Sequence, residues 1–223
     1  MPLPSKITFR WQVAQAAEWR WWQQYLKTKP KDVYLAWKRA YWQQLLDKIQ
    51  PPLGLPPQAA VLDAGCGPAG IFLALDASYQ ITALDPLLDK YAATLPHFVP
   101  DDYPNTRFVC QTLEAWHEAN GYDAVFCMNA INHVADIQQC FDNLISAARP
   151  NASIVVTIDA HNYSLCKRVF RALPGDVLHP CQYDLAEYLQ MLSSRGVEII
   201  QILALKREFF FTHYLLCGKK IGK

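Results

Sequence analysis

Short apolar runs alternate with segments of helical periodicity over most of the chain. The runs predict strands at residues 59–62, 80–84, 106–110, 122–127, 152–158, 197–205 and 209–217. The intervening segments predict helices at residues 69–77, 86–94, 137–148, 163–173 and 184–194. This alternation predicts an α/β fold whose sheet is mostly parallel, with helices on both faces. The last two strands, joined by a short turn, predict an antiparallel hairpin.

The first 50 residues follow a different pattern. Residues 9–27 and 31–49 predict two helices, because Pro30 restricts the residue before it and suits the start of a helix. On a helical wheel, most aromatic side chains of the first helix share an arc of roughly 160°, with Glu18 inside it. Six of the seven tryptophans belong to this pair of helices: Trp11, Trp19, Trp21, Trp22, Trp37 and Trp42.

Two roles for this aromatic extension remain open. The tryptophans can dock the helices on the sheet domain, or they can form a lid whose aromatic faces contact a ligand, and one helix can do both. The proline-rich residues 51–58 predict a stiff connector. We therefore divide the chain into a helical extension (1–50), a connector (51–58) and a cofactor-binding domain (59–223).

Composition narrows the class of protein. The net charge of +1 predicts no strong attraction to nucleic acid or to a membrane surface. The chain has no apolar stretch of about 18 residues that would span a bilayer and no apolar signal-peptide core. Its seven cysteines form neither a CxxC pair nor a zinc pattern, so we expect reduced thiols, no metal and a soluble cytoplasmic protein, either a monomer or a homodimer.

A glycine-rich turn after the first strand carries the clearest chemistry. Gly65, Gly67 and Gly70 have the spacing of a dinucleotide-binding turn, where missing side chains let a ligand approach the backbone. We expect free backbone N–H groups and the start of the helix at 69–77 to face the ligand. Asp85 ends the second strand, where a carboxylate can accept hydrogen bonds from a ribose diol. Asp63 precedes the first glycine by two residues.

The pattern apolar-apolar-Asp-x-Gly-x-Gly at residues 61–67 resembles motif I of the class I S-adenosylmethionine-dependent methyltransferases. This resemblance implies a Rossmann-like, seven-stranded sheet with an antiparallel C-terminal hairpin, and S-adenosylmethionine as cofactor. It places Asp63 at the methionine end of the cofactor, Leu113 and Glu114 at the adenine, and the segment after the fourth strand under the methionine moiety. The implied cofactor-binding residues are Asp63, Gly65, Cys66, Gly67, Asp85, Pro86, Leu113, Glu114, Asn129 and Ala130.

The side of the site that would bind the methyl acceptor is less defined. Asn132-His133 resembles a Glu-His pair found in small-molecule members of the family, with Asn in place of Glu, and residues 179–183 resemble a His-Pro-x-x-Tyr segment that borders the acceptor. A general base is needed only for a protonated acceptor, and its candidates are His133, His161, His179 and Glu18. The candidates for binding the acceptor are Trp11, Trp22, Asn132 and Tyr183.

The predicted activity is transfer of a methyl group from S-adenosylmethionine, by in-line displacement, to a small apolar or aromatic molecule. A non-catalytic S-adenosylmethionine-binding module that supports a partner through its tryptophan-rich helices is one alternative. An NAD-dependent oxidoreductase is another, since the glycine spacing alone fits it. No Asn-Pro-Pro-Tyr motif follows the fourth strand to indicate methylation of an amide or a base amine.

Overall fold

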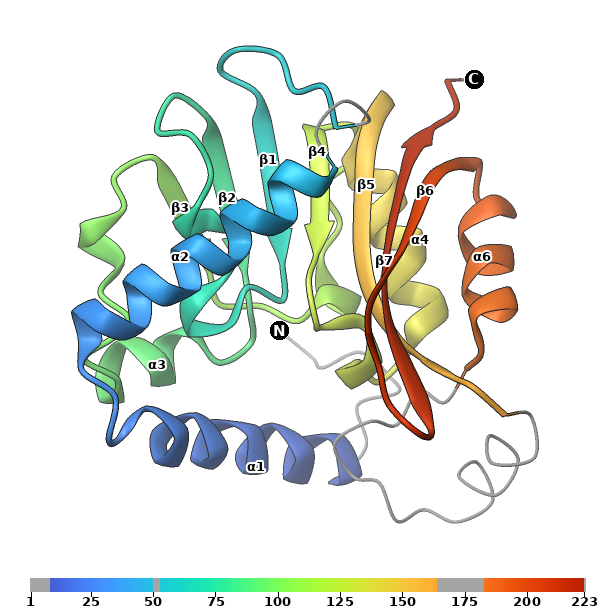
Figure 1. The fold of residues 1–223 in the computed structure, drawn as a ribbon. Coiled ribbons are helices and arrows are strands. Elements are labelled where there is room, and N and C mark those ends of the chain that lie inside the picture. Colours follow the sequence, from blue (N-terminus) through green and yellow to red (C-terminus); the bar gives the residue numbers. More distant parts are fainter. Residues whose placement is uncertain (1–8, 50–52, 164–182, 223) are drawn as a thin grey trace.

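The computed structural model describes residues 9–49, 53–163 and 183–222. Seven strands form one sheet in the order β3-β2-β1-β4-β5-β7-β6 (Figure 1). All neighbouring pairs from β3 to β5 are parallel, and β7 is antiparallel to both β5 and β6. The strands are β1 (Ala60–Ala64), β2 (Gln80–Leu84), β3 (Thr106–Val109), β4 (Tyr122–Cys127), β5 (Ala148–His161), β6 (Val197–Arg207) and β7 (Phe211–Lys220). The predicted fold class is confirmed.

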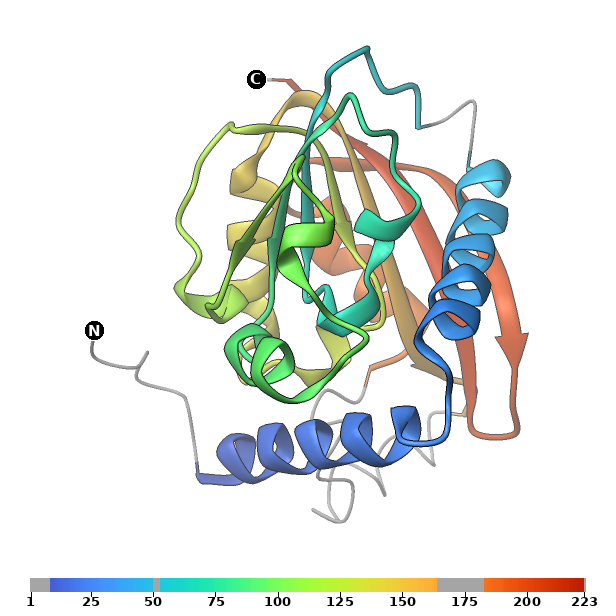
Figure 2. The same cartoon turned by 90° about the vertical axis from the view of Figure 1, so that its left-hand side faces the viewer.

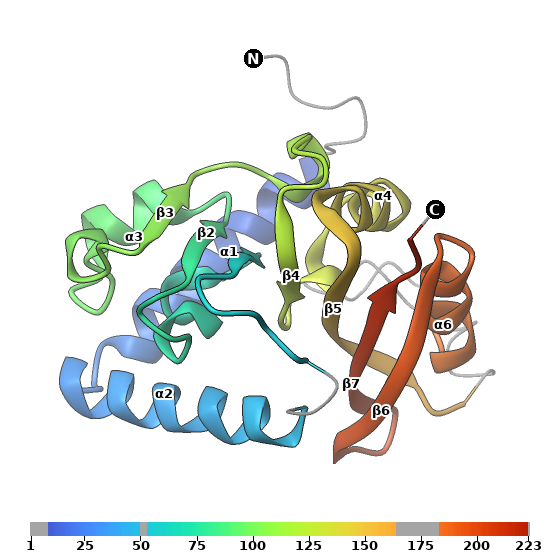
Figure 3. The ribbon, with the colours of Figure 1, turned by 90° about the horizontal axis from the view of Figure 1, so that it is seen from above.

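Helices cover both faces of this sheet. Seen from above, α2 (Lys31–Lys48) crosses one face, whereas α4 (Ile137–Ala147) and α6 (Leu185–Ser193) lie on the other (Figure 3). Two apolar clusters follow this division, because one joins α2 to the sheet and the other joins α4 and α6 to it. Among the described residues, none of the helices is both long enough and apolar enough to cross a membrane.

The first helix, α1 (Phe9–Leu26), runs across the ends of the strands rather than along a face (Figures 1 and 2). It passes below the carboxyl ends of the parallel strands, where open α/β sheets bind their ligands. Trp19 donates its indole N–H to the Thr94 hydroxyl at 3.3 Å, at the end of α3 (Leu88–Thr94). Trp22 meets the buried ring of Tyr91 edge-on at 6.4 Å. These contacts dock α1 on the cofactor domain.

The helix predicted at residues 69–77 is wrong. Two short 3₁₀ turns, Gly67–Ala69 and Ile71–Leu73, take its place, because the backbone of Gly70 is extended (ψ −174°) and interrupts any helix between them. Side chains of α2 satisfy the carbonyl groups that a helix would have bonded. Trp42 donates to the Ala69 carbonyl at 3.0 Å, and Arg39 donates to the Leu73 carbonyl at 2.9 Å. Packing of α2 thus replaces local helical structure.

Other predicted elements agree with the structure to within a few residues. The main difference is β5, which extends over Ala148–His161 instead of 152–158, because Ala148 pairs with Tyr122 of β4 and β7 pairs with β5 as far as His161. Most of the helix predicted at residues 163–173 lies outside the described residues, and so does His179.

Candidate active site

A cavity of about 480 Å³ lies at the carboxyl edge of the sheet, enclosed by α1 and α2. Thirteen of the eighteen residues proposed from the sequence line it: Trp11, Glu18, Trp22, Gly65, Cys66, Gly67, Asp85, Pro86, Leu113, Glu114, Asn129, Ala130 and His133. Asp63, Asn132, His161 and Tyr183 are not part of its wall. The sequence analysis missed several other lining residues, among them Gln15, Tyr34, Lys38, Gln111, Thr112 and Met128.

The conformation and close packing of the glycine turn require residues without side chains. Gly65 has φ +72°, and a Cβ atom there would lie 2.2 Å from the Cβ of Ala130, which no side chain can accommodate. Gly67 has φ +57°, and its missing side chain leaves open space up to the ring of Trp22, 3.7 Å from where the Cβ would be. The turn therefore fits closely against the segment after β4 and opens toward α1.

The backbone N–H groups of this turn do not face the cavity as we expected. Gly65 and Cys66 both donate to the Leu84 carbonyl, at 2.7 and 3.0 Å, and Gly67 donates to the Asp85 carboxylate at 2.9 Å. Two 3₁₀ turns stand behind the glycine turn in place of a helix, so the segment 67–73 directs no α-helix dipole at the cavity. The attraction for a ligand must come from side chains.

Asp85 is the clearest of these side chains. Its two carboxylate oxygens accept N–H bonds from Gly67 at 2.9 Å and from Leu87 at 2.8 Å, which fix its orientation at the cavity wall. Each oxygen can accept a further hydrogen bond, so a ribose diol can bind here. Burial raises the pKa of Asp85 to about 6, opposed by the two backbone hydrogen bonds.

Asp63 lies behind the glycine turn. One oxygen accepts the Phe72 N–H at 3.1 Å, while the other is buried with no hydrogen-bond partner. Gly70 is required beside it, because a Cβ there would lie 2.4 Å from the bonded oxygen. Burial raises the pKa of Asp63 to about 7, and the Lys38 charge acts in the opposite direction. An ionised Asp63 would favour a cationic group nearby.

Lys38 is a cation that the sequence did not single out. It lines the cavity from α2, with its ammonium over the rings of Trp42 at 4.2 Å and Tyr41 at 4.9 Å. Burial lowers its pKa to about 8, although the neighbouring charge of Asp63 raises it. Lys38 is therefore a cation at the cavity wall that suits a carboxylate ligand, whereas Asp63 lies behind the glycine turn and is not part of the wall.

Aromatic side chains form the wall opposite the glycine turn. Those of α1 include Trp21, which stacks on Tyr25 with ring centroids 4.7 Å apart. Glu18 is the acidic group among them. Gln15 donates to it at 3.4 Å, and burial, together with the charge of Asp85, raises its pKa to about 7. The full aromatic set is Trp11, Trp21, Trp22, Tyr25, Tyr34, Trp37 and Trp42.

The loop after β3 differs in detail from the prediction. Leu113 and Glu114 line the cavity, but Glu114 is buried and its Oε1 accepts the backbone N–H groups of Ala135 at 2.7 Å and Asp136 at 3.3 Å. Those bonds make Glu114 a brace for the start of α4. Gln111 and Thr112 also face the cavity, and the buried Thr112 hydroxyl has no hydrogen-bond partner.

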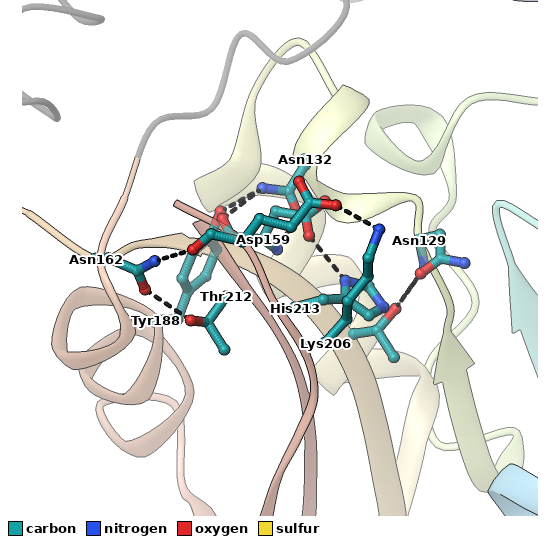
Figure 4. Close-up of polar contacts among 10 residues, drawn as sticks. Asn129, Asn132, Asp159, Asn162, Tyr188, Lys206, Thr212 and His213 are labelled. Carbon is teal, nitrogen blue, oxygen red and sulfur yellow. Dashed lines mark hydrogen bonds and ion pairs between the residues drawn. The ribbon is translucent and has the colours of Figure 1, made fainter. Parts of the chain in front are cut away.

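In the segment after β4, some residues line the cavity and one, Asn132, is buried in a set of hydrogen bonds. Asn129, Ala130 and His133 line the cavity. Asn132 is 3% exposed; its amide N–H groups donate to the Tyr188 hydroxyl at 2.8 Å and to the Asp159 carbonyl, and its oxygen accepts the Asp159 N–H (Figure 4). With these bonds made, direct contact between Asn132 and an acceptor is disfavoured.

Two further candidates lie toward β7. His161 is buried, with its ring 4.4 Å from that of Phe211, and its backbone N–H donates to the carbonyl of Tyr183. The ring of Tyr183 meets Tyr188 at 5.7 Å. Both side chains pack among other aromatic rings outside the cavity wall.

A family model described as a methyltransferase domain matches residues 34–202. The chain belongs to this methyltransferase domain family. The match argues against the NAD-dependent oxidoreductase, and it confirms the predicted S-adenosylmethionine-dependent methyltransferase family and its cofactor. It begins within α2, so it includes Lys38 and Trp42 but not α1.

Proteins named ubiquinone biosynthesis O-methyltransferase are similar to this methyltransferase. The one from Rickettsia akari is 29% identical over 98 residues, which cover 44% of this chain and 39% of the relative. The one from Rickettsia canadensis is 25% identical over 170 residues, or 72% of each protein. The chain thus spans well under half of the first relative's length.

Among solved structures, a Burkholderia thailandensis 1,6-didemethyltoxoflavin-N1-methyltransferase has the same fold. It superposes with a TM-score of 0.65 at 13% identity, covering 100% of this chain and 93% of the other. That structure holds 1,6-didemethyltoxoflavin and S-adenosylhomocysteine.

The residues of the cavity fit S-adenosylmethionine. Asp85 can take the ribose diol, the Lys38 ammonium suits the carboxylate of the methionine end, and Leu113 offers an apolar surface to the adenine. Asp63 lies behind the cavity wall and acts through its charge on Lys38. The glycine turn leaves space where a side chain at Gly67 would otherwise stand. The fit rests on side-chain chemistry rather than on the backbone N–H groups of the turn.

Proposed function

We propose that this methyltransferase transfers a methyl group from S-adenosylmethionine to a small molecule that is apolar or aromatic. The enclosure of the cavity by seven aromatic side chains of α1 and α2 is the observation that carries the proposal. Flat aromatic walls with few polar groups favour a ring-shaped or apolar ligand. The names of the similar proteins support it, since they include an O-methyltransferase of ubiquinone biosynthesis and an N-methyltransferase with a bound aromatic heterocycle.

In this mechanism the chain binds the cofactor and the acceptor, orients them toward each other and excludes water from the cavity. S-adenosylmethionine supplies a methyl group on a sulfonium, which is already a good leaving group. Asp85 would hold the ribose, and Lys38 the carboxylate of the methionine end, so that the methyl group is fixed in position. Trp22, which lies over Gly67, would keep water from the reacting atoms.

The proposal also assigns the parts of the chain. Residues 1–50 act as a docked lid, residues 51–58 as a connector, and residues 59–223 as the cofactor-binding domain. We propose a cytoplasmic protein that works as a monomer or homodimer. The burial of Cys66, Cys127 and Cys217 suits reduced thiols.

Calorimetric titration with S-adenosylmethionine, S-adenosylhomocysteine and NAD tests the cofactor, and a panel of phenols, catechols and aromatic amines then tests the acceptor. We expect micromolar binding of the adenosyl ligands, weakened in Asp85→Ala, and turnover of at least one aromatic acceptor. Binding of NAD alone would refute the proposal. Tight adenosyl binding without turnover, together with copurification of a second chain in equal amount, would favour the non-catalytic module.

A further inference from the structure

Asp159 and His213 form a hydrogen-bonded pair at the end of β5. The two residues are direct partners in the antiparallel β5–β7 ladder, and the His213 Nδ1 lies 2.8 Å from the Asp159 Oδ1 (Figure 4). Their side chains remain partly exposed, His213 at 20% and Asp159 at 39%. This exposure leaves both groups open to contact with a ligand.

The pair is linked to the cavity wall through Asn129, although neither residue lines the cavity itself. Thr157 precedes Asp159 by two residues, so both side chains project from the same face of β5. The Thr157 hydroxyl accepts the Asn129 N–H at 2.6 Å and donates to the Asn129 side-chain oxygen at 2.9 Å, and Asn129 lines the cavity. Two residues of a strand span about 7 Å, so an acceptor that extends past Asn129 would reach His213.

The backbone of Asp159 is fixed by hydrogen bonds to Asn132. Asn132 bonds both its backbone N–H and its carbonyl, each at 3.2 Å, and is itself fixed by the Tyr188 hydroxyl at 2.8 Å. This bracket sets the direction of the carboxylate toward β7. It also gives the buried Asn132 a role in positioning.

The charged groups near the pair come from the β6–β7 hairpin. Lys206 pairs with Glu208, and the charge of Asp159 also acts on Lys206. Within the described residues, Asp159 on β5 and Lys206 on β6 are the ladder partners of His213, and Glu208 pairs with Lys206. A carboxylate bonded to Nδ1 requires the hydrogen there, which leaves the lone pair on Nε2.

We propose that His213 is the general base for the methyl acceptor, positioned by Asp159, and that the acceptor bears an ionisable hydroxyl group. This inference rests on the proposed function and makes the substrate class more specific. The acceptor proton moves to Nε2 of His213 as the hydroxyl oxygen bonds to the methyl carbon, and the electrons of the broken carbon–sulfur bond stay on sulfur. The imidazolium, stabilised by Asp159, then releases its proton to water.

A binding measurement tests this without turnover. The probe is 4-nitrocatechol added to the complex with S-adenosylhomocysteine, at a pH below that at which the free catechol ionises. We expect the absorbance of the ionised form with the wild type and the neutral form with His213→Gln and Asp159→Asn. His117→Gln, which changes an exposed histidine outside the cavity wall, should behave as the wild type. Wild type that fails to bind or to ionise the probe would overturn the inference.

Kinetics on an acceptor from the panel separate this inference from the proposed function. His213→Gln should lower kcat by about 10²- to 10⁴-fold, leave the KM for S-adenosylmethionine unchanged and remove the acidic limb of the pH–rate profile. Turnover by the wild type with unchanged kcat in His213→Gln would sustain the proposed function and sink the inference. The same loss in His133→Gln but not in His213→Gln would assign the base to His133 instead.

Discussion

Lys38→Met should weaken binding of S-adenosylhomocysteine while leaving binding of 5′-methylthioadenosine unchanged. The two ligands share the adenosine part, but only the first carries the amino-acid carboxylate that we assign to Lys38. Met keeps an unbranched stem across the ring of Trp42, over which the ammonium lies at 4.2 Å. The substitution therefore removes the charge and preserves most of the packing.

The magnitude follows from the environment of Lys38. Its ammonium is buried enough for its pKa to fall to about 8, so a carboxylate bound there is poorly screened by water. A hydrogen bond between charged groups contributes about 1.5–3 kcal/mol, which corresponds to a loss of about 10- to 150-fold in affinity. The wild type should also lose affinity for S-adenosylhomocysteine as the pH rises above about 8, because the ammonium loses its proton.

Isothermal titration calorimetry of both ligands with both proteins, at several pH values, gives the difference directly. Lys31→Met is the matched control, since Lys31 is on the same helix and pairs with Asp102 outside the cavity wall. An equal loss for both ligands would indicate a disturbed cavity instead of a lost charge contact. No loss for either ligand would refute the assignment of Lys38 to the carboxylate.

Three further changes test the structure. Gly65→Ala should destabilise the fold by about 2–5 kcal/mol in thermal unfolding, because its backbone is left-handed and its Cβ would clash with Ala130. Adding Ala130→Gly should recover only the part of this loss that comes from the clash. A Gly65→Ala variant as stable as the wild type would contradict the geometry. Because the pKa of Glu18 is raised from 4.5 to about 7, the folded protein binds more protons than the unfolded chain between those values and should lose stability as pH rises through them. Glu18→Gln should make that slope less steep in denaturant titrations, while Asp63 and Asp85, whose pKa values are also raised, keep the remainder, and an unchanged slope would place the proton elsewhere. Asn132→Ala should lower the free energy of unfolding by about 2–4 kcal/mol, because the Tyr188 hydroxyl and the Asp159 backbone lose their hydrogen-bond partner. The affinity for S-adenosylhomocysteine should change little. A large loss of affinity with normal stability would instead indicate that Asn132 contacts the ligand directly.

Much of the fold and of the cofactor site could be predicted from the sequence. The strand at 122–127 agrees with β4 at both ends, and the break at Pro30 separates α1 from α2 as expected. Asp85 follows β2 and reaches the cavity because the carboxyl ends of parallel strands lie at one edge of a sheet. These features depend on local periodicity and on neighbours close in the chain, which a sequence displays directly.

Tertiary structure decided the features that join distant residues. The segment at 69–77 reads as a helix, yet Trp42 and Arg39 of α2 bond its carbonyl groups and leave two 3₁₀ turns. In the sequence Lys38 is one of several lysines in a helical segment, and only the packing of α2 makes it half-buried at the cavity wall. Asp159 and His213 are 54 residues apart and meet only through the β5–β7 register. Sequence patterns indicate where helices and strands form, because the periodicity of apolar and polar residues is a local property. Which side chains share a cavity depends on how those elements pack.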